Sequence, residues 1–149
     1  MIGEQQCKRI LETATQSSVV DECEAFLSAN QLSLTRFANN TIHQNVSHSD
    51  AQLFIRSVIG KRQGRSTTND LSLSGIVRCR ESARQNANLM PQDPDFLGLP
   101  EPSAISKVSA YDESTAFSDP ETRANIVKRI TTNSEKNKLV SAGFCRTGI

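Results

Sequence analysis

The stretch LSLTRFANNTIHQNV, residues 32–46, decides the fold. Apolar and polar residues alternate on both sides of its centre, which is the period of a strand with one buried face. Asparagine tolerates positive φ, so the pair Asn39-Asn40 predicts a tight turn between two paired strands. The alternating apolar positions are Leu32, Leu34, Ile42 and Val46. We therefore expect an antiparallel hairpin with Asn39-Asn40 at its tip.

Further strands are expected after this hairpin. His48-Ser49-Asp50 predicts a second turn, and QLFIRSVIG (52–60) is apolar on both faces in places, as in a central strand. Gly60-Lys61 places glycine at the first position of a type II′ turn, which leads into a polar strand at 62–68. Together these segments predict a meander of antiparallel strands.

Two helices flank the meander in the sequence. Residues 4–16 carry their apolar side chains at helical spacing, so we expect an amphipathic helix there. A second helix is predicted over 71–89, with Asp70 as its N-cap and Met90-Pro91 at its end. Both helices have one apolar face and are expected to pack on the sheet.

The segment between residues 19 and 34 fits two patterns. Helical spacing joins one set of apolar residues, and strand alternation joins another. The first set is Val19, Val20, Cys23, Phe26 and Leu27. The second is Cys23, Ala25 and Leu27 on one face, followed by Leu32 and Leu34 after a turn at Asn30. Periodicity alone does not decide between them.

The fold class predicted from these elements is α+β: two helices packed on an antiparallel sheet, followed by the start of a second α+β unit. The segment 91–103 separates the two parts, because it holds four of the five prolines. We expect an N-terminal α+β domain at 1–90 and a second unit at 104–149. That unit begins with a helix capped by Asp119-Pro120 and continues with a strand at 139–145. The early stop after this strand predicts truncation.

Composition excludes several classes of function. Lys plus Arg number 17 against 16 acidic residues, which argues against nucleic acid as the main partner. The N-terminus has no apolar stretch of a signal peptide, and no apolar run reaches the ~20 residues of a membrane span. The four cysteines lie at no metal-ligand spacing. We expect a cytoplasmic protein with reduced thiols and no membrane partner.

The catalytic inventory is thin. No nucleophile elbow, phosphate loop or His-Glu-x-x-His motif occurs, and the only histidines are His43 and His48. The basic hairpin GKRQGRS (60–66) is interpreted as solvated charge at a sheet edge, with an anion or peptide-carboxylate site as the alternative. These residues do not predict a self-contained enzyme.

Four stretches together resemble the N-terminal region of the TldD/PmbA family. They are LTRFANNTIHQNV, RSVIGKRQGRSTTND, LSLSGIVRCRESARQNANL and the connection PQDPDFLGLPEP. The resemblance covers essentially the whole chain and is most specific over 32–102. It also implies a strand at DECEAFLSA, which favours the strand interpretation of the ambiguous segment.

The resemblance implies an intracellular zinc metallopeptidase, of a family also called modulators of DNA gyrase. Such proteins combine an α+β N-terminal part with a larger β-rich part, and they work as homodimers or heterodimers. Active members hold zinc with a His-Glu-x-x-x-His helix and a later cysteine, which leaves one open position for water. Residues 1–149 contain no such motif. This segment is thus expected to be inactive alone and to hold no cofactor, with zinc in the full-length protein.

Within that family, the hairpin is expected to bind substrate. An extended or unfolded peptide would add to its strand edge, and the expected substrate-binding residues are Arg36, Phe37, Asn39, Asn40, His43 and Gln44. In the alternative interpretation, these side chains form the turn, the core and a dimer or domain contact. The resemblance leaves a second alternative open for the whole chain. It would then belong to a non-catalytic, metal-less partner subunit that acts as a peptide-binding or assembly module.

Overall fold

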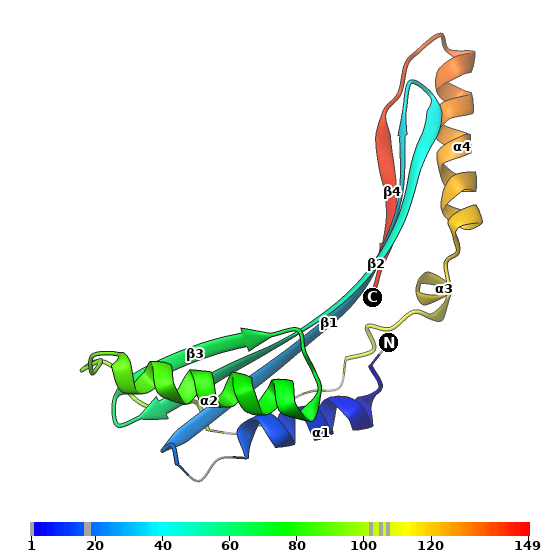
Figure 1. Ribbon diagram of the computed structural model, residues 1–149. Helices are drawn as coiled ribbons and strands as arrows, with labels where there is room; N and C mark the ends of the chain where they lie inside the picture. Colours follow the sequence, from blue (N-terminus) through cyan, green and yellow to red (C-terminus); the bar gives the residue numbers. More distant parts are fainter. Residues whose placement is uncertain (1, 17–18, 102, 105, 107) are drawn as a thin grey trace. The chain divides into compact units, whose positions relative to one another are not determined.

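The computed structural model describes residues 2–16, 19–101, 103–104, 106 and 108–149. Four strands form one antiparallel sheet in the order β3-β2-β1-β4, accompanied by helices (Figure 1). The predicted α+β class is confirmed. The elements are α1 (Glu4–Thr15), β1 (Glu22–Ala38), β2 (Thr41–Ile59), β3 (Arg62–Thr68), α2 (Leu73–Leu89), α3 (Glu113–Ala116), α4 (Pro120–Lys136) and β4 (Gly143–Gly148).

The chain folds into two compact units. Unit 1 comprises Met1–Ala29 and Asp50–Ile105, and unit 2 comprises Asn30–Ser49 and Ser106–Ile149. Each unit thus combines segments that are distant in the sequence, because β1 and β2 contribute to both. The domain limits expected from the sequence follow chain order and remain a prediction.

The second turn predicted at His48-Ser49-Asp50 is wrong. Strand β2 runs without interruption through these residues. Serine and aspartate favour turns because their side chains bond to nearby backbone groups. Here the 17-residue β1 offers a neighbouring strand along this stretch, and ladder hydrogen bonds outweigh the local preference. The strand that the family resemblance favoured from about residue 22 is confirmed, but the turn expected at Asn30 is wrong, because β1 continues through it to Ala38.

In unit 1 the helices cover one face of the sheet. The hydrophobic core consists of residues from α1, β2 and α2: Ile10, Ala14, Leu53, Ile55, Ile76, Cys79 and Ala83. Helix α2 lies very close to β3 at Gly64, where an added Cβ would stand 2.0 Å from the backbone nitrogen of Ala87. The N-cap of α2 is Ser72, whose hydroxyl accepts a bond from the Gly75 N–H at 3.1 Å. Asp70 instead accepts a bond from the Ser72 N–H, so its prediction as the cap is wrong by two residues.

The proline-rich connection is tied to unit 1 by hydrogen bonds. The Asp93 N–H donates to the Lys61 carbonyl at 2.9 Å, and the Lys61 ammonium donates to the Pro94 carbonyl at 2.7 Å. The Leu99 N–H donates to the Glu22 carboxylate at 2.6 Å. Residues 93–99 therefore lie along the β2–β3 turn and the start of β1.

In unit 2, α4 covers one face of the strands. The strands β1 and β4 pair antiparallel from Leu32↔Gly148 to Phe37↔Gly143. Helix α4 buries three residues at four-residue spacing, Arg123, Val127 and Thr131. The strand predicted at 139–145 begins later, at Gly143, because residues 139–141 form a loop that bonds to the hairpin tip. The helix start at Asp119-Pro120 is confirmed, with the Thr122 N–H donating to the Asp119 carboxylate at 2.7 Å.

Candidate functional site

The hairpin tip has the predicted two-residue turn. Asn39 and Asn40 have φ values of 50° and 58°, the left-handed pair that a type I′ turn requires. The Asn40 amide also anchors the loop before β4. Its Nδ2 donates to the Leu139 carbonyl at 2.9 Å, and its Oδ1 accepts bonds from the backbone N–H and the hydroxyl of Ser141 at 2.7 and 2.6 Å. Both ends of this amide are therefore engaged within unit 2.

Phe37 is part of the core of unit 2. Its side chain is buried, and a Cβ added at Gly143 on the neighbouring β4 would stand 3.1 Å from the Phe37 ring. The absence of a side chain at Gly143 thus makes room for this ring. The other four predicted substrate-binding residues, Arg36, Asn39, His43 and Gln44, are exposed. Their role in binding, like that of Phe37 and Asn40, remains a prediction.

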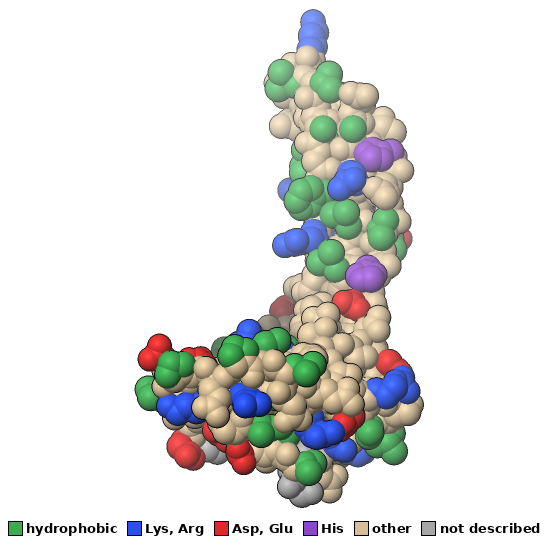
Figure 2. Space-filling view, turned by 60° about the vertical axis from the view of Figure 1, so that its left-hand side comes forward, with side chains coloured by type: hydrophobic (Ala, Val, Ile, Leu, Met, Phe, Trp, Pro, Cys, Tyr) green, Lys and Arg blue, Asp and Glu red, His purple; other side chains and the backbone are tan. Residues whose placement is uncertain are grey.

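Arg36 lies on the sheet face opposite α4. Its neighbours in the strand, Thr35 and Phe37, are buried on the α4 side, so alternation turns Arg36 to the other side. The register pairs Arg36 with Phe144, and Leu34 with Arg146. We call the face with Leu34, Arg36, Phe144 and Arg146 the open face of unit 2. Figure 2 shows hydrophobic, basic and histidine side chains side by side on the strands of this unit.

Beneath α4 lies a buried cation that the sequence did not reveal. Arg123 is 1% exposed and donates to the Ser118 carbonyl at 3.0 Å, the Asn45 amide oxygen at 3.3 Å and the Thr147 hydroxyl at 3.4 Å. Its Nε has no partner, and no carboxylate among the described residues forms an ion pair with it. Neutral acceptors on β2 and β4 thus hold Arg123 and connect α4 to the sheet. A helical arginine normally indicates a solvated face, so no signal in the sequence pointed to this burial.

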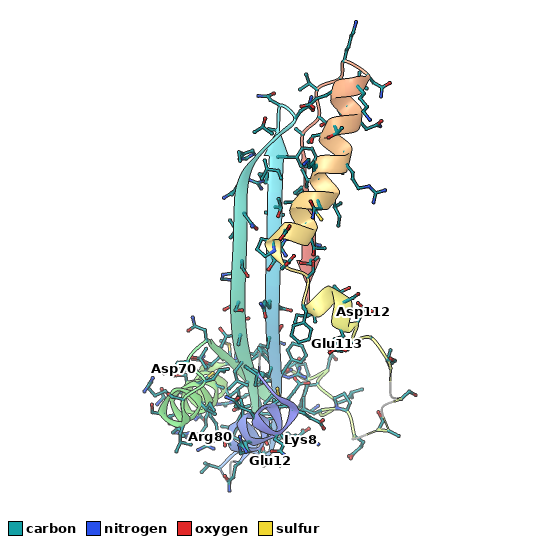
Figure 3. The ribbon with its side chains drawn as sticks, turned by 90° about the vertical axis from the view of Figure 1, so that its right-hand side faces the viewer. Lys8, Glu12, Asp70, Arg80, Asp112 and Glu113 are labelled. Carbon is teal, nitrogen blue, oxygen red and sulfur yellow. The ribbon has the colours of Figure 1, made fainter. Side chains whose placement is uncertain are left out.

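Charge is unevenly distributed along unit 2. Residues 123–149 carry six Lys or Arg side chains and a single acid, Glu135. Most acids of this unit precede them, and Figure 3 shows Asp112 and Glu113 on α3. Hydrogen bonds from Ser114 and Thr115 hold the pKa of Asp112 below its ordinary value. The net charge of +1 for the whole chain therefore conceals a basic part.

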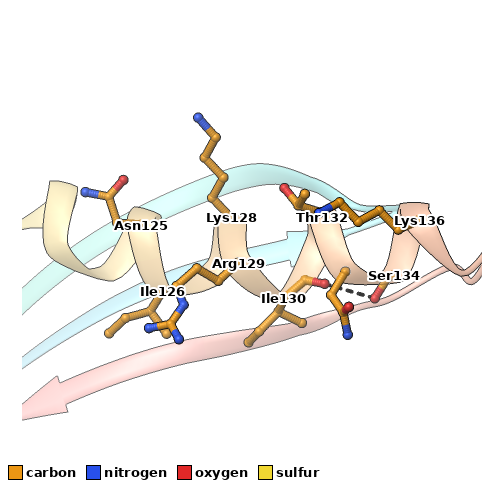
Figure 4. A pocket seen from close by; sticks show the side chains of 9 residues that line it. Asn125, Ile126, Lys128, Arg129, Ile130, Thr132, Ser134 and Lys136 are labelled. Atoms are coloured by element: carbon orange, nitrogen blue, oxygen red, sulfur yellow. Dashed lines mark hydrogen bonds between the residues drawn. The ribbon is translucent and has the colours of Figure 1, made fainter.

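A shallow hollow runs along α4, with a volume of about 890 Å³. Figure 4 shows Ile126 and Ile130 on the side of α4 where β4 lies, while Asn125 and Lys128 point the other way. The isoleucines are 43% and 46% exposed, although they neighbour the buried row of α4. Helix α4 therefore presents a second apolar row beside the sheet.

Over the part of the chain that the structure describes, no three His, Cys, Asp or Glu side chains gather closely enough to hold a metal ion. Within the same residues, no helix is both long and apolar enough to cross a membrane. Burial raises the pKa of the Cys23 thiol above its ordinary value.

Residues 23–87, which include the hairpin and most of α2, match the family model described as PmbA/TldA metallopeptidase domain 1. This match supports the resemblance of the chain to the N-terminal region of the TldD/PmbA family. Solved structures of similar fold include TldE from Thermococcus kodakarensis, at 18% identity and a TM-score of 0.78. The aligned region covers 96% of this chain and 37% of the TldE chain. A search of curated proteins finds no match.

Two further solved structures of similar fold are described as modulators of DNA gyrase. One is from Thermotoga maritima, with 14% identity, a TM-score of 0.69, and coverage of 97% of this chain and 38% of its own. The other is from Bacteroides thetaiotaomicron, with 12% identity, a TM-score of 0.74, and coverage of 99% and 40%. At these identities the likeness shows the fold. The present chain spans about two-fifths of the length of these solved relatives.

Proposed function

We propose that this chain is the N-terminal, substrate-side and dimer-building part of a cytoplasmic TldD/PmbA-like metallopeptidase that cleaves peptides. The observation that carries the proposal is the match of residues 23–87 to the first domain of that metallopeptidase family. The catalytic zinc would be held by residues outside these 149. In that case the chain contributes binding and assembly, and zinc supplies the activation of water for attack on a peptide carbonyl.

The outer edge of β2 supports binding of an extended peptide. Strand β3 pairs with β2 only from Leu53 to Ile59, so no described strand lies beside residues 41–52 on that side. Side chains along 41–50 are all exposed. An unpaired strand edge offers N–H and C=O groups to which a peptide can add as a further strand. The side chains of the bound peptide would contact four exposed residues of this hairpin: Arg36, Asn39, His43 and Gln44. Phe37 and Asn40 would instead maintain the conformation of the hairpin.

A second function remains open for the full-length protein. It would be a metal-less partner subunit in a heterodimer, which presents peptides without cleaving them. The exposed edge of β2 would serve such a subunit as well, because presenting a peptide requires a binding surface and no metal. Both functions use the same strand edge, so only the remainder of the protein separates them.

The test is elemental analysis and peptide hydrolysis with the full-length gene product. Stoichiometric zinc together with cleavage that a chelator abolishes would support the peptidase. Absence of both zinc and cleavage would assign the chain to the partner subunit. Replacing Gln44 with alanine should raise KM several-fold and leave kcat unchanged, because a lost contact to bound peptide weakens binding alone. Gln5→Ala, at an exposed glutamine on α1, is the matched control.

A further inference from the structure

We propose that the outer edge of β4 binds an extended polypeptide segment with apolar side chains on one face and acidic side chains on the other. This site lies at the opposite edge of the sheet from residues 41–52 of β2. It uses three features of unit 2: free backbone groups on β4, an apolar row on α4 and unpaired arginines on the open face. It does not depend on peptide hydrolysis.

The backbone of β4 presents hydrogen-bonding groups outward. Gln31 and Ile149 exchange two backbone bonds, at 2.8 and 3.0 Å, so they form a hydrogen-bonded pair of the antiparallel ladder. Such pairs alternate along the strands, which directs the groups of Cys145 and Thr147 towards β1. The N–H and C=O of Phe144 and Arg146 therefore point away from β1. No described strand lies on that side of β4.

The apolar row on α4 lies beside the same edge. Ile126 and Ile130 project from α4 on the side of β4 and remain nearly half exposed (Figure 4). A strand added to β4 would direct every second side chain towards α4, because strand side chains alternate between faces. Valine or isoleucine at those positions would cover the two isoleucines. The row thus selects apolar residues on one face of the bound segment.

Arginines select the other face. Arg36 and Arg146 lie diagonally on the open face, since Arg36 pairs with Phe144 and Arg146 with Leu34. Neither arginine forms an ion pair among the described residues, and Phe144 is 62% exposed beside them. Acidic side chains on an added strand would lie next to Arg146 and gain an opposite charge.

The three features together favour a polypeptide over a nucleic acid. A basic surface with an exposed aromatic ring suits single-stranded nucleic acid as well as acidic peptide. However, the outward backbone groups of Phe144 and Arg146 match only another polypeptide strand. Ile126 and Ile130 gain nothing from phosphate, and Arg129 beside them suits a carboxylate as well as a phosphate. A nucleic acid would make neither the backbone hydrogen bonds nor the apolar contacts. An amphipathic strand makes both of them and the charge contacts as well, so it is the ligand that we propose.

The experiment measures binding of a labelled peptide, acetyl-Glu-Val-Glu-Val-Glu-Val-Glu-amide, to the full-length gene product. Fluorescence anisotropy is recorded in EDTA at low salt, so a failure of hydrolysis does not affect the result. We expect saturable binding that weakens by about tenfold in Arg146→Glu, because a favourable charge contact becomes repulsive. Arg9→Glu, the same change at an exposed arginine of α1, should leave the affinity unchanged. A peptide with lysine in place of glutamate should not bind.

A second pair of variants tests backbone pairing. Arg146→Gln removes the charge alone, and Arg146→Pro also removes the outward N–H while the bonds of Cys145 and Thr147 to β1 remain. The proline variant should bind several-fold more weakly than the glutamine variant. Equal affinities would overturn strand pairing, and so would absence of peptide binding to the full-length product. Tighter binding of an oligothymidine strand than of the peptide would overturn the choice of occupant.

Discussion

The close approach of α2 to β3 gives the sharpest prediction about stability. A Cβ added at Gly64 would stand 2.0 Å from the Ala87 nitrogen, 2.2 Å from the Ala83 carbonyl oxygen and 2.7 Å from the Ala87 Cα. All three are backbone atoms, so no side-chain rotation relieves the overlap. Helix α2 would have to move away from β3 by roughly 1.4 Å to restore the 3.4 Å of an ordinary contact.

That displacement would open the core of unit 1. Ile76, Cys79 and Ala83 on α2 belong to the buried cluster, and they would separate from Leu53 and Ile55 as the helix moves. Overpacking of a well-packed core costs typically about 1–3 kcal/mol and occasionally more. Because the three nearest atoms are backbone atoms of one turn of α2, which can yield only by moving the helix, we expect Gly64→Ala to lower the free energy of unfolding by about 3 kcal/mol or more.

The assay is urea unfolding followed by circular dichroism, with hydrogen exchange of the α2 amides as a local probe. The control is Gly60→Ala, because Gly60 has a φ of +60° and open space around its Cα. Its cost is therefore conformational alone, about 1–2 kcal/mol. If Gly64→Ala destabilises the protein less than Gly60→Ala, the argument from steric overlap is refuted.

Three further predictions concern unit 2. Asn40→Ala should destabilise the β4 loop by about 1–3 kcal/mol, since three hydrogen bonds of the Asn40 amide, to the Leu139 carbonyl and to the N–H and hydroxyl of Ser141, are lost. Faster exchange of the Ser141 amide would report the loss. Arg123→Met should destabilise the protein by about 1–3 kcal/mol in thermal unfolding, because the Ser118 carbonyl, the Asn45 amide oxygen and the Thr147 hydroxyl lose their donor; an unchanged or higher midpoint would contradict this. Hydrogen bonds from Thr122 hold the pKa of Asp119 below its ordinary value in the folded protein. The stabilisation of α4 by this cap is therefore fully present above the ordinary pKa, and it is lost as the pH falls through the lowered pKa of the folded state. Asp119→Asn should therefore reduce the loss of α4 helicity, followed by circular dichroism, between neutral and strongly acidic pH.

Local chemistry explains the elements that the sequence predicted. Two asparagines in succession allow the left-handed turn at 39–40, and alternation on both sides allows strands. Asp119 and Pro120 restrict the start of α4 to one place, because proline lacks the N–H that a helix interior needs. Each of these signals acts within a few residues, so a single sequence is enough to read it.

Partners distant in the sequence explain what was missed. The polar run at 48–50 becomes a strand because β1 lies beside it, and Leu139 stays in a loop because Asn40 holds it there, 99 residues away. Arg123 is buried by acceptors on β2 and β4, which no pattern within α4 indicates. Of the predicted binding residues, two proved to be engaged inside unit 2 because their partners lie on β4 and the loop before it. The spacing of these residues in the sequence is compatible with a buried and with an exposed side chain, so it does not distinguish the two.

The positions of the charged side chains and of the unpaired strand edges indicate more about possible binding partners than the net charge does. A chain of net charge +1 gives little reason to expect an electrostatic surface, yet residues 123–149 hold six of its 17 basic side chains and one acid. A charged residue on an edge strand often serves only to prevent sheet-to-sheet aggregation. Arg146 is such a residue, and the two roles differ in their consequences. If Arg146 only prevents aggregation at the edge, Arg146→Gln would let the protein self-associate and leave its affinity for the peptide unchanged. If Arg146 binds the peptide, the monomeric variant would bind the acidic peptide more weakly. Light scattering beside the anisotropy measurement on the Arg146→Gln variant therefore decides between protection of the edge and its use.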